Sequence, residues 1–149
     1  MLVTLEIPKR LVLDTTVLID HLRSKNRDTL ASRLEGRAEL ATTIINRFEL
    51  YYGAYKSKDV RRNLTSVKGV FSTLQVLSMT EGAAEQAGRL LAQLEAKGRP
   101  IESRDLFVGA IALEEGYAVL TDDLEHFERI PGVQVVEAKQ LFVELDRLV

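Results

Sequence analysis

The sequence predicts an α/β fold built on a largely parallel sheet. Short apolar runs alternate with longer stretches of helical periodicity along the 149 residues, which is the pattern of parallel strands joined by helices. The first run is apolar on both faces, as expected for a strand that is covered on both sides. Because 46% of the residues are apolar and 28% are charged, we expect one domain, residues 1–149, with a core of its own.

Five apolar runs predict the strands. Each is short, and each is separated from the next by a turn or a stretch of helical spacing. The runs lie at residues 11–13, 39–42, 74–77, 117–120 and 133–136. The alternation of strand and helix is the reason to expect parallel pairing.

Helices are expected between these strands and after the last one. In order they begin at residue 16, at 26 or 28, and at 42, 58, 80, 103 and 138. Thr80 and Ser103 are suited to cap the helices that follow them, and Gly98 and Gly116 to end those helices.

The composition excludes several kinds of site. The chain has no cysteine, so it has no disulfide, no thiolate metal site and no cysteine nucleophile, and it has two histidines. The formal net charge of −2 argues against nucleic-acid binding through overall basicity. No apolar run is long enough to span a membrane, and the first residues lack a secretory pattern. We therefore expect a cytoplasmic protein with no membrane segment.

Acidic residues stand where a packed core has little use for charge. Asp14 follows the first strand, Asp122 and Asp123 follow the fourth, and Asp105 lies at the head of an apolar helix. Ligands of open α/β sheets bind outside the carboxyl ends of the strands, so we expect these acids at one edge. Because clustered carboxylates repel one another unless a cation lies between them, they indicate a site for Mg²⁺ or Mn²⁺.

Each acid also has a structural explanation. Asp14 can form an Asx turn, Asp105 suits the positive end of its helix, and Asp123 can lie in a turn. A glutamate on an amphipathic helix, such as Glu49, is usually solvated. The metal-site hypothesis depends on convergence at one edge, where carboxylate-held ions can hydrolyse a phosphodiester without a histidine base.

Three blocks follow one another between Leu11 and about Val136. They read LVLDTTVLID, TTIINRFELYYGA and GRPIESRDLFVGAIALEEGYAVLTDDLEHFERIPGVQVV. In order and spacing they resemble the PIN-domain family, and most of all the VapC-type toxin ribonucleases of toxin-antitoxin modules. The resemblance implies a three-layer α/β/α sandwich whose central, mainly parallel sheet has four to five strands.

The resemblance also implies a function. Members of this kind are Mg²⁺- or Mn²⁺-dependent endoribonucleases that cut single-stranded RNA and are inhibited by a small antitoxin protein. For this chain it implies the toxin of a type II toxin-antitoxin pair, an RNA substrate, an antitoxin partner and a homodimer.

Carried over residue by residue, the resemblance assigns catalysis and metal binding to acids at matching positions, Asp14, Glu49, Asp105 and Asp123. Similar proteins have Thr, any residue, then Asp or Asn after the last apolar strand, which selects Asp123 and leaves Asp122 as a neighbour that could take its place. The hydroxyls expected to orient the acids are those of Thr15, Thr16 and Thr121. Thr16 departs from the family, which often has asparagine or serine there.

RNA contacts are expected from basic side chains, namely Arg23, Lys25, Arg61, Arg62 and Arg104. Scattered cations are, however, mostly solvated surface. Tyr51, Tyr52 and Tyr55 can stack on bases, although their helical spacing favours the core or a partner interface. His126 is interpreted as structural.

Two other functions remain open. The alternative to a nuclease is a non-catalytic PIN-like module that binds RNA or a partner, and the presence of all the acids argues against it. A phosphatase of the haloacid dehalogenase type uses an aspartate after an apolar strand, but it needs a second aspartate two positions later. Thr16 occupies that position.

Overall fold

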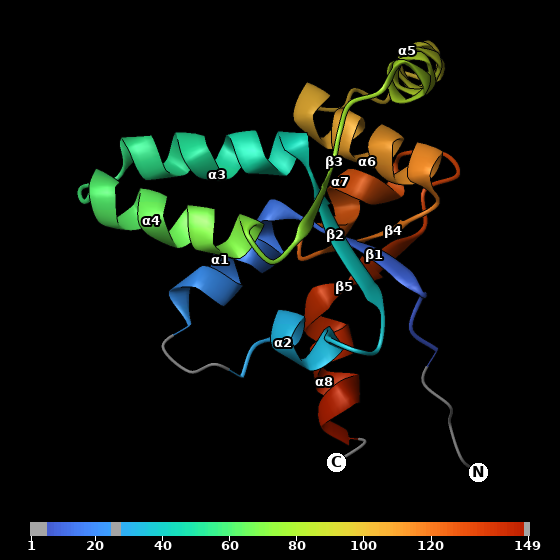
Figure 1. Cartoon of the computed structure of the whole chain (residues 1–149). Coiled ribbons are helices and arrows are strands. Elements are labelled where there is room, and N and C mark those ends of the chain that lie inside the picture. The colour runs from blue at the N-terminus through green and yellow to red at the C-terminus, as the bar shows by residue number, and fades with distance from the viewer. Residues whose placement is uncertain (1–5, 25–27, 148–149) are drawn as a thin grey trace.

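A five-stranded parallel sheet forms the centre of the molecule, as shown by the computed structural model, which describes residues 6–24 and 28–147 (Figure 1). The strand order is β3-β2-β1-β4-β5. The strands are β1 (Arg10–Leu13), β2 (Glu39–Thr43), β3 (Gln75–Leu77), β4 (Ala118–Thr121) and β5 (Val135–Glu137). All four pairings are parallel, so every strand ends at the same edge.

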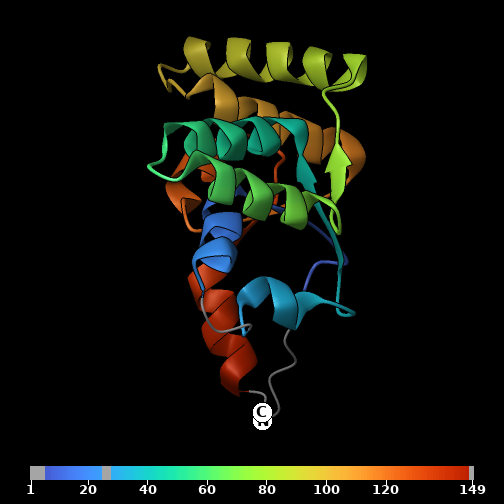
Figure 2. The same cartoon turned by 60° about the vertical axis from the view of Figure 1, so that its left-hand side comes forward.

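Helices follow and connect the strands. They are α1 (Thr15–Arg23), α2 (Leu30–Leu34), α3 (Ile44–Lys56), α4 (Val60–Phe71), α5 (Glu81–Ala96), α6 (Ser103–Glu115), α7 (Leu124–Glu128) and α8 (Ala138–Arg147). Figures 1 and 2 show α3 and α4 side by side, and α5 lying outside α6. In the part of the chain that is described, no helix is long and apolar enough to cross a membrane.

The sheet separates two apolar clusters, which makes the fold three-layered. Val12 on β1 packs with residues of α5, α6 and α7 on one face. Its neighbours Leu11 and Leu13 pack with residues of α1, α4 and α8 on the other face. Successive side chains of a strand point to opposite faces, so a strand that is apolar at each position serves both clusters. The predicted α/β sandwich with a parallel sheet is confirmed, with five strands.

Some predicted boundaries are wrong. Ser103 does not cap α6: it is the first helical residue, and Glu102 holds the extended N-cap position without a side-chain cap bond. The second helix does not start at Asp28 but at Leu30, because Thr29 caps it through its side chain. The alternative start at residue 26 lies outside the described residues. The short helix α7 was not expected at all.

Other local predictions are confirmed. Thr80 caps α5 by accepting a hydrogen bond from the backbone N–H of Ala83. Gly116 ends α6 in the left-handed conformation, with a φ of 77°, which glycine adopts without steric cost. The strand that follows therefore starts immediately, and it brings Thr121 to the carboxyl edge beside the end of β1.

Candidate active site at the carboxyl edge of the sheet

Asp14 is the most enclosed acid of the predicted site. It follows β1, is 5% exposed, and its backbone N–H continues the sheet by donating to the carbonyl of Leu120 at 3.0 Å. The Thr121 hydroxyl donates to Oδ2 of Asp14 at 2.8 Å, and the Asn46 amide donates to Oδ1 at 3.1 Å. The Thr16 hydroxyl makes a longer contact of 3.5 Å. The carboxylate is thus held from three separate segments.

Glu49 reaches the same place from α3. The Thr15 hydroxyl donates to its Oε1 at 3.0 Å, and Thr15 Oγ1 in turn accepts from the Asn46 amide at 3.0 Å. The guanidinium of Arg104 lies 3.8 Å from Oε2 of Glu49 and is better placed against Glu102, at 3.0 Å. Glu49 is therefore an anchored carboxylate of the site and not a freely solvated helix residue.

Asp105 joins from the first turn of α6, with about a fifth of its side chain exposed. Its Oδ2 lies 3.2 Å from Nδ1 of His126, which the short helix α7 carries. From the sequence His126 is interpreted as structural, and the structure shows in addition that it contacts an acid of the predicted site. Two of the predicted acids have a cationic or potentially cationic neighbour from this chain, Arg104 for Glu49 and His126 for Asp105.

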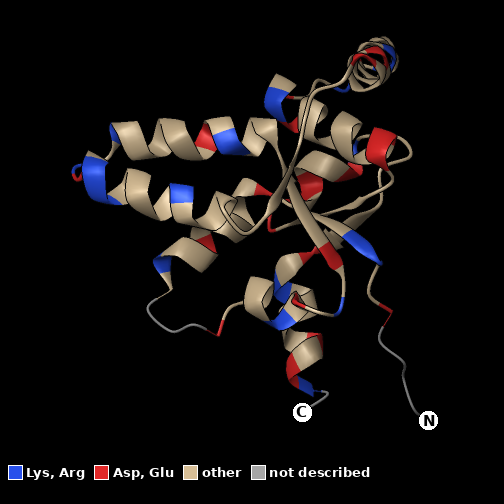
Figure 3. Ribbon diagram, viewed as in Figure 1, with Lys and Arg blue, Asp and Glu red and all other residues tan. Residues whose placement is uncertain are grey.

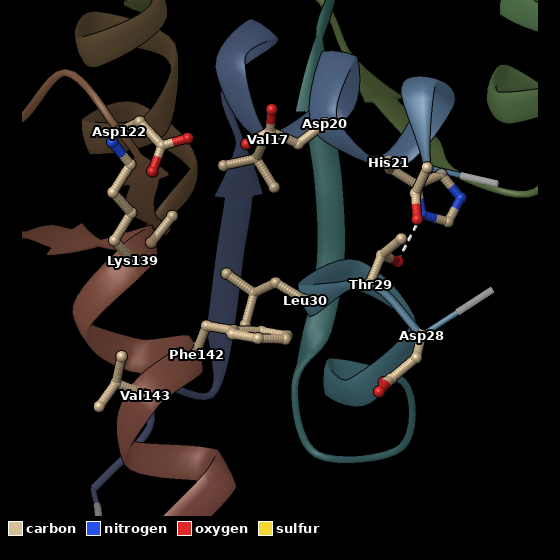
Figure 4. A pocket seen from close by; sticks show the side chains of 12 residues that line it. Val17, Asp20, His21, Asp28, Thr29, Leu30, Asp122, Lys139, Phe142 and Val143 are labelled. Atoms are coloured by element: carbon tan, nitrogen blue, oxygen red, sulfur yellow. Dashed lines mark hydrogen bonds between the residues drawn. The ribbon is translucent and has the colours of Figure 1, made fainter. Parts of the chain in front are cut away.

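The two aspartates after β4 point to different surroundings. The backbone N–H of Asp123 donates to Thr121 Oγ1 at 2.9 Å, which ties Asp123 to the hydroxyl that also holds Asp14. Asp122 lies beside Asp20, whose charge raises its pKa, and it lines a cavity of about 390 Å³ between α1, α2 and α8 (Figure 4). Its backbone N–H donates to Thr16 Oγ1 at 3.1 Å. The charge of Asp123 raises the pKa of both Asp14 and Asp105. This supports Asp123 as the fourth acid, an assignment that remains a prediction.

Burial and mutual repulsion perturb these carboxyl groups. Burial raises the pKa of Asp14, the charge of Asp123 raises it further, and the hydrogen bonds from Thr121 and Asn46 oppose the rise. Burial likewise raises the pKa of Glu49, to which the charges of Asp14 and Asp105 add. The pKa of Asp105 is raised by burial first, opposed by His126, and raised again by Asp14. Such coupling is expected of acids that share one site.

The donor set suits a hard divalent cation. The acids supply carboxylate oxygens, which Mg²⁺ and Mn²⁺ prefer, and they come from different elements that meet at one edge. Within residues 6–24 and 28–147, however, no three Asp, Glu or His side chains are already gathered closely enough to hold an ion. The residues fit such an ion in type, and they lie near enough for their charges to act on one another's pKa values.

The predicted RNA contacts divide into three groups. Arg104 lies at the site. Arg23 and Arg62 line a groove of about 750 Å³ between α1, α3 and α4, and Glu49 lines the same groove. Arg61 is exposed on α4 but does not line it, and Lys25 lies outside the described residues. Figure 3 shows cations towards the far ends of α1 and α4.

The aromatic residues of α3 also divide. Tyr51 is half-buried against Phe71, with ring centroids 6.1 Å apart. Tyr52 and Tyr55 are 49% and 66% exposed, so their assignment to the core is wrong. They continue an outward stripe with Phe48, which is 55% exposed and stacks on Tyr52. The interface interpretation of these rings remains a prediction.

Asn46 is the contributor that the sequence prediction missed. It is fully buried and contacts both Asp14 and Thr15. One signal was available, because Thr43 and Asn46 have the spacing of a capping box at the start of α3. That pattern predicts a helix start and says nothing about an acid 32 residues earlier.

The chain is similar to known ribonucleases over most of its length. Residues 11–133 match the family model described as PIN domain. The tRNA(fMet)-specific endonuclease VapC of Salmonella typhimurium is 33% identical over 126 residues, which are 85% of this chain and 96% of that protein. Ribonuclease VapC19 of Mycobacterium tuberculosis is 30% identical over 125 residues, covering 83% of this chain and 96% of the relative.

Solved structures agree with this similarity. The structure of DNA-bound VapBC from Salmonella typhimurium contains a chain with a TM-score of 0.80 and 33% identity, covering 87% of this chain and 98% of that one. VapBC-5 from Mycobacterium tuberculosis is described as a member of the VapBC family of toxin-antitoxin systems. Its chain has a TM-score of 0.64 and 26% identity, and the match covers 87% of this chain and 98% of that one. The chain therefore belongs to the PIN-domain family, among its VapC members.

Proposed function

We propose that this chain is an endoribonuclease that hydrolyses phosphodiester bonds in single-stranded RNA and acts as the toxin of a type II toxin-antitoxin pair. The observation that carries the proposal is the convergence of Asp14, Glu49 and Asp105, whose pKa values are all raised by burial and shared charge. Perturbed acids gathered in one place indicate a reactive site. The curated relatives are themselves named ribonucleases or endonucleases.

The proposed cofactor is Mg²⁺ or Mn²⁺, held by acids from four parts of the fold, Asp14, Glu49, Asp105 and Asp123. When bound, such an ion supplies an activated water and stabilises the charge that develops on the phosphate. Thr121 and Thr15 hold Asp14 and Glu49 in place through 2.8 Å and 3.0 Å hydrogen bonds. This support comes from this chain's own side chains and precedes any ligand.

Arg104 is the proposed contact for the RNA phosphate nearest the acids. Its side chain is 43% exposed, and its guanidinium lies 3.8 Å from Glu49 without a close bond to it. A guanidinium can exchange a weak carboxylate contact for a bidentate bond to a phosphate. Arg23 and Arg62 are proposed to follow the strand along the groove that they share with Glu49.

Proposed partners are a small antitoxin protein and a second copy of this chain. The antitoxin is supported by the solved relatives, which are VapBC complexes. The homodimer is supported by apolar area left uncovered on α3, where Ile44, Phe48, Tyr52 and Tyr55 are each at least 40% exposed. Contiguous exposed apolar side chains of this kind are typical of interaction surfaces.

The proposal is tested by an RNA cleavage assay with Mg²⁺ or Mn²⁺. Initiator tRNA is the first substrate to try, because one curated relative is named tRNA(fMet)-specific. We expect cleavage by the wild-type chain, and none with chelator or with Asp105→Asn. Equal cleavage by Asp105→Asn would reject the assignment of the site, and RNA binding without cleavage would support a non-catalytic PIN-like module.

A further inference from the structure

We infer that Asn46 is a positioning residue that fixes the direction of the hydrogen bonds at both Asp14 and Glu49. The inference rests on the proposed function for its catalytic consequence, but its geometry stands alone. Asn46 is 0% exposed and lies in the first turn of α3, one turn before Glu49. Its side chain contacts the end of β1, the start of α1 and the N-cap of its own helix.

The orientation of the Asn46 amide follows from its neighbours. The backbone N–H of Thr43 can only donate, and it points at one end of the amide at 3.2 Å. That end must therefore be the oxygen, which also accepts from the Thr43 hydroxyl at 2.7 Å. The NH₂ group consequently faces Asp14 Oδ1 at 3.1 Å and Thr15 Oγ1 at 3.0 Å.

The orientation of the amide then decides the orientation of the Thr15 hydroxyl. Thr15 Oγ1 accepts a proton from Asn46, so its own proton is free to point at Glu49 Oε1, 3.0 Å away. Asp14 and Glu49 each accept a hydrogen bond, and neither carboxylate acts as a donor in this network. A buried amide with all its groups paired has no second orientation of similar energy, because a flip would leave donors facing donors.

The same amide completes the capping box of α3, so its structural role must be separated from its role in the site. The chain contains a matched comparison in α2, where Thr29 and Ser32 form the same reciprocal pair. The hydroxyl of Ser32 accepts from the Thr29 backbone N–H and donates to the Thr29 carbonyl. Ser32 contacts no site acid in these bonds and therefore reports the cost of losing a cap alone.

The test compares Asn46→Asp, Asn46→Ala and Ser32→Ala in the full chain. Asn46→Asp keeps the oxygen that caps α3 and replaces the donating NH₂ with a second oxygen. We expect both Asn46 variants to bind Mn²⁺ about 10- to 100-fold more weakly by electron paramagnetic resonance titration, and to lose kcat by a similar factor at nearly unchanged KM for RNA. Ser32→Ala is expected to lose stability but to keep Mn²⁺ affinity and kcat.

A crystal structure of metal-free Asn46→Asp supplies a readout independent of activity. We expect the Thr15 hydroxyl to turn away from Glu49, because it must now donate to the carboxylate oxygen that takes the place of the lost NH₂. Wild-type Mn²⁺ affinity in Asn46→Asp, or an unchanged Thr15 to Glu49 bond, would overturn the inference. A wild-type chain that binds Mn²⁺ but cuts no RNA would reject the proposed function and still leave the inference decided by these two measurements.

Discussion

The end of β4 separates two unlike regions of the molecule. On one side lies the acid site to which we assign Asp123, where carboxylates from different elements raise one another's pKa values. On the other side Asp122 lines a cavity whose walls are mostly apolar, including Val17, Leu30 and Phe142 (Figure 4). The apolar walls of the cavity suit an organic ligand, whereas three carboxylates with raised pKa values, those of Asp14, Glu49 and Asp105, meet at the acid site.

The difference between the two regions lies in the partners of their acids. Burial raises the pKa of Asp122, the neighbouring Asp20 raises it further, and Lys139 opposes the rise. Asp20 and Asp122 are like charges, and Oδ1 of Asp122 is buried with no hydrogen-bond partner among the described residues. At the acid site three acids from different elements, Asp14, Glu49 and Asp105, act on one another, and His126 and Arg104 each contact one of them. The acid site is therefore set apart by the number of carboxylates that act on one another.

The largest expected effect distinguishes the adjacent aspartates. Asp123→Asn should reduce RNA cleavage at least about 100-fold, because it removes a proposed metal ligand, whereas Asp122→Asn should reduce it less than about tenfold. Initial rates at saturating Mg²⁺ measure both. The reverse order of effects would show that Asp122 belongs to the acid site and would remove the contrast between the regions.

An apolar substitution in the cavity should act on stability alone. Leu30→Ala removes part of the wall near Phe142, and since Leu30 is only half-buried we expect a loss of about 1 to 2 kcal/mol. Urea unfolding measures the loss, and cleavage per folded molecule should stay at the wild-type level. Loss of cleavage by the folded variant would mean that the cavity takes part in the chemistry.

The acid site should carry a stability cost that depends on pH. Burial raises the folded pKa of Asp105 above its ordinary value of 3.8, so its favourable contribution is fully present below pH 3.8 and is lost as pH rises through the folded pKa. At neutral pH the ionised group therefore destabilises the metal-free fold. Asp105→Asn should raise the metal-free Tm at pH 7 by a few degrees, with the difference from wild type shrinking as the pH falls toward that ordinary value. A lower Tm for the variant at pH 7 would contradict this.

The smallest effect is expected at Lys139, the cation of the cavity. Its side chain is exposed, so Lys139→Ala should change the free energy of unfolding by no more than about 0.5 kcal/mol. Cleavage should be unchanged. Thermal melting and the cleavage assay together check this, and a large fall in either would show that the Asp122 side of β4 is coupled to the acid site.

The positions of the acids could be predicted because they depend on chain connectivity. An aspartate directly after a parallel strand must emerge at the carboxyl edge, and the pairing of Leu13 with Leu120 brings Asp14 and Thr121 together there. The position of Asp105 could be predicted because this residue stands at the start of an apolar helix. These features depend on local sequence and on one rule about parallel sheets.

Contacts between distant polar groups could not be predicted in the same way. The bond between Asn46 and Asp14 and the approach of Asp20 to Asp122 join separate segments through single side chains. The buried face of helix α3 was still harder to predict, because apolar residues occur on both faces of the helix. Its buried face carries Asn46, Leu50 and Ala54, and a polar residue there concealed which stripe meets the core.

The strand order also governs when the site can exist during synthesis. Asp14 lies at the end of the central strand β1, and Thr121, which holds it, lies at the end of β4, the strand paired to its other side. A nascent chain can pair β1 with β2 early, but the polar bonds around Asp14 stay incomplete until residue 121 has left the ribosome. Almost the whole domain must therefore leave the ribosome before the site around Asp14 can form.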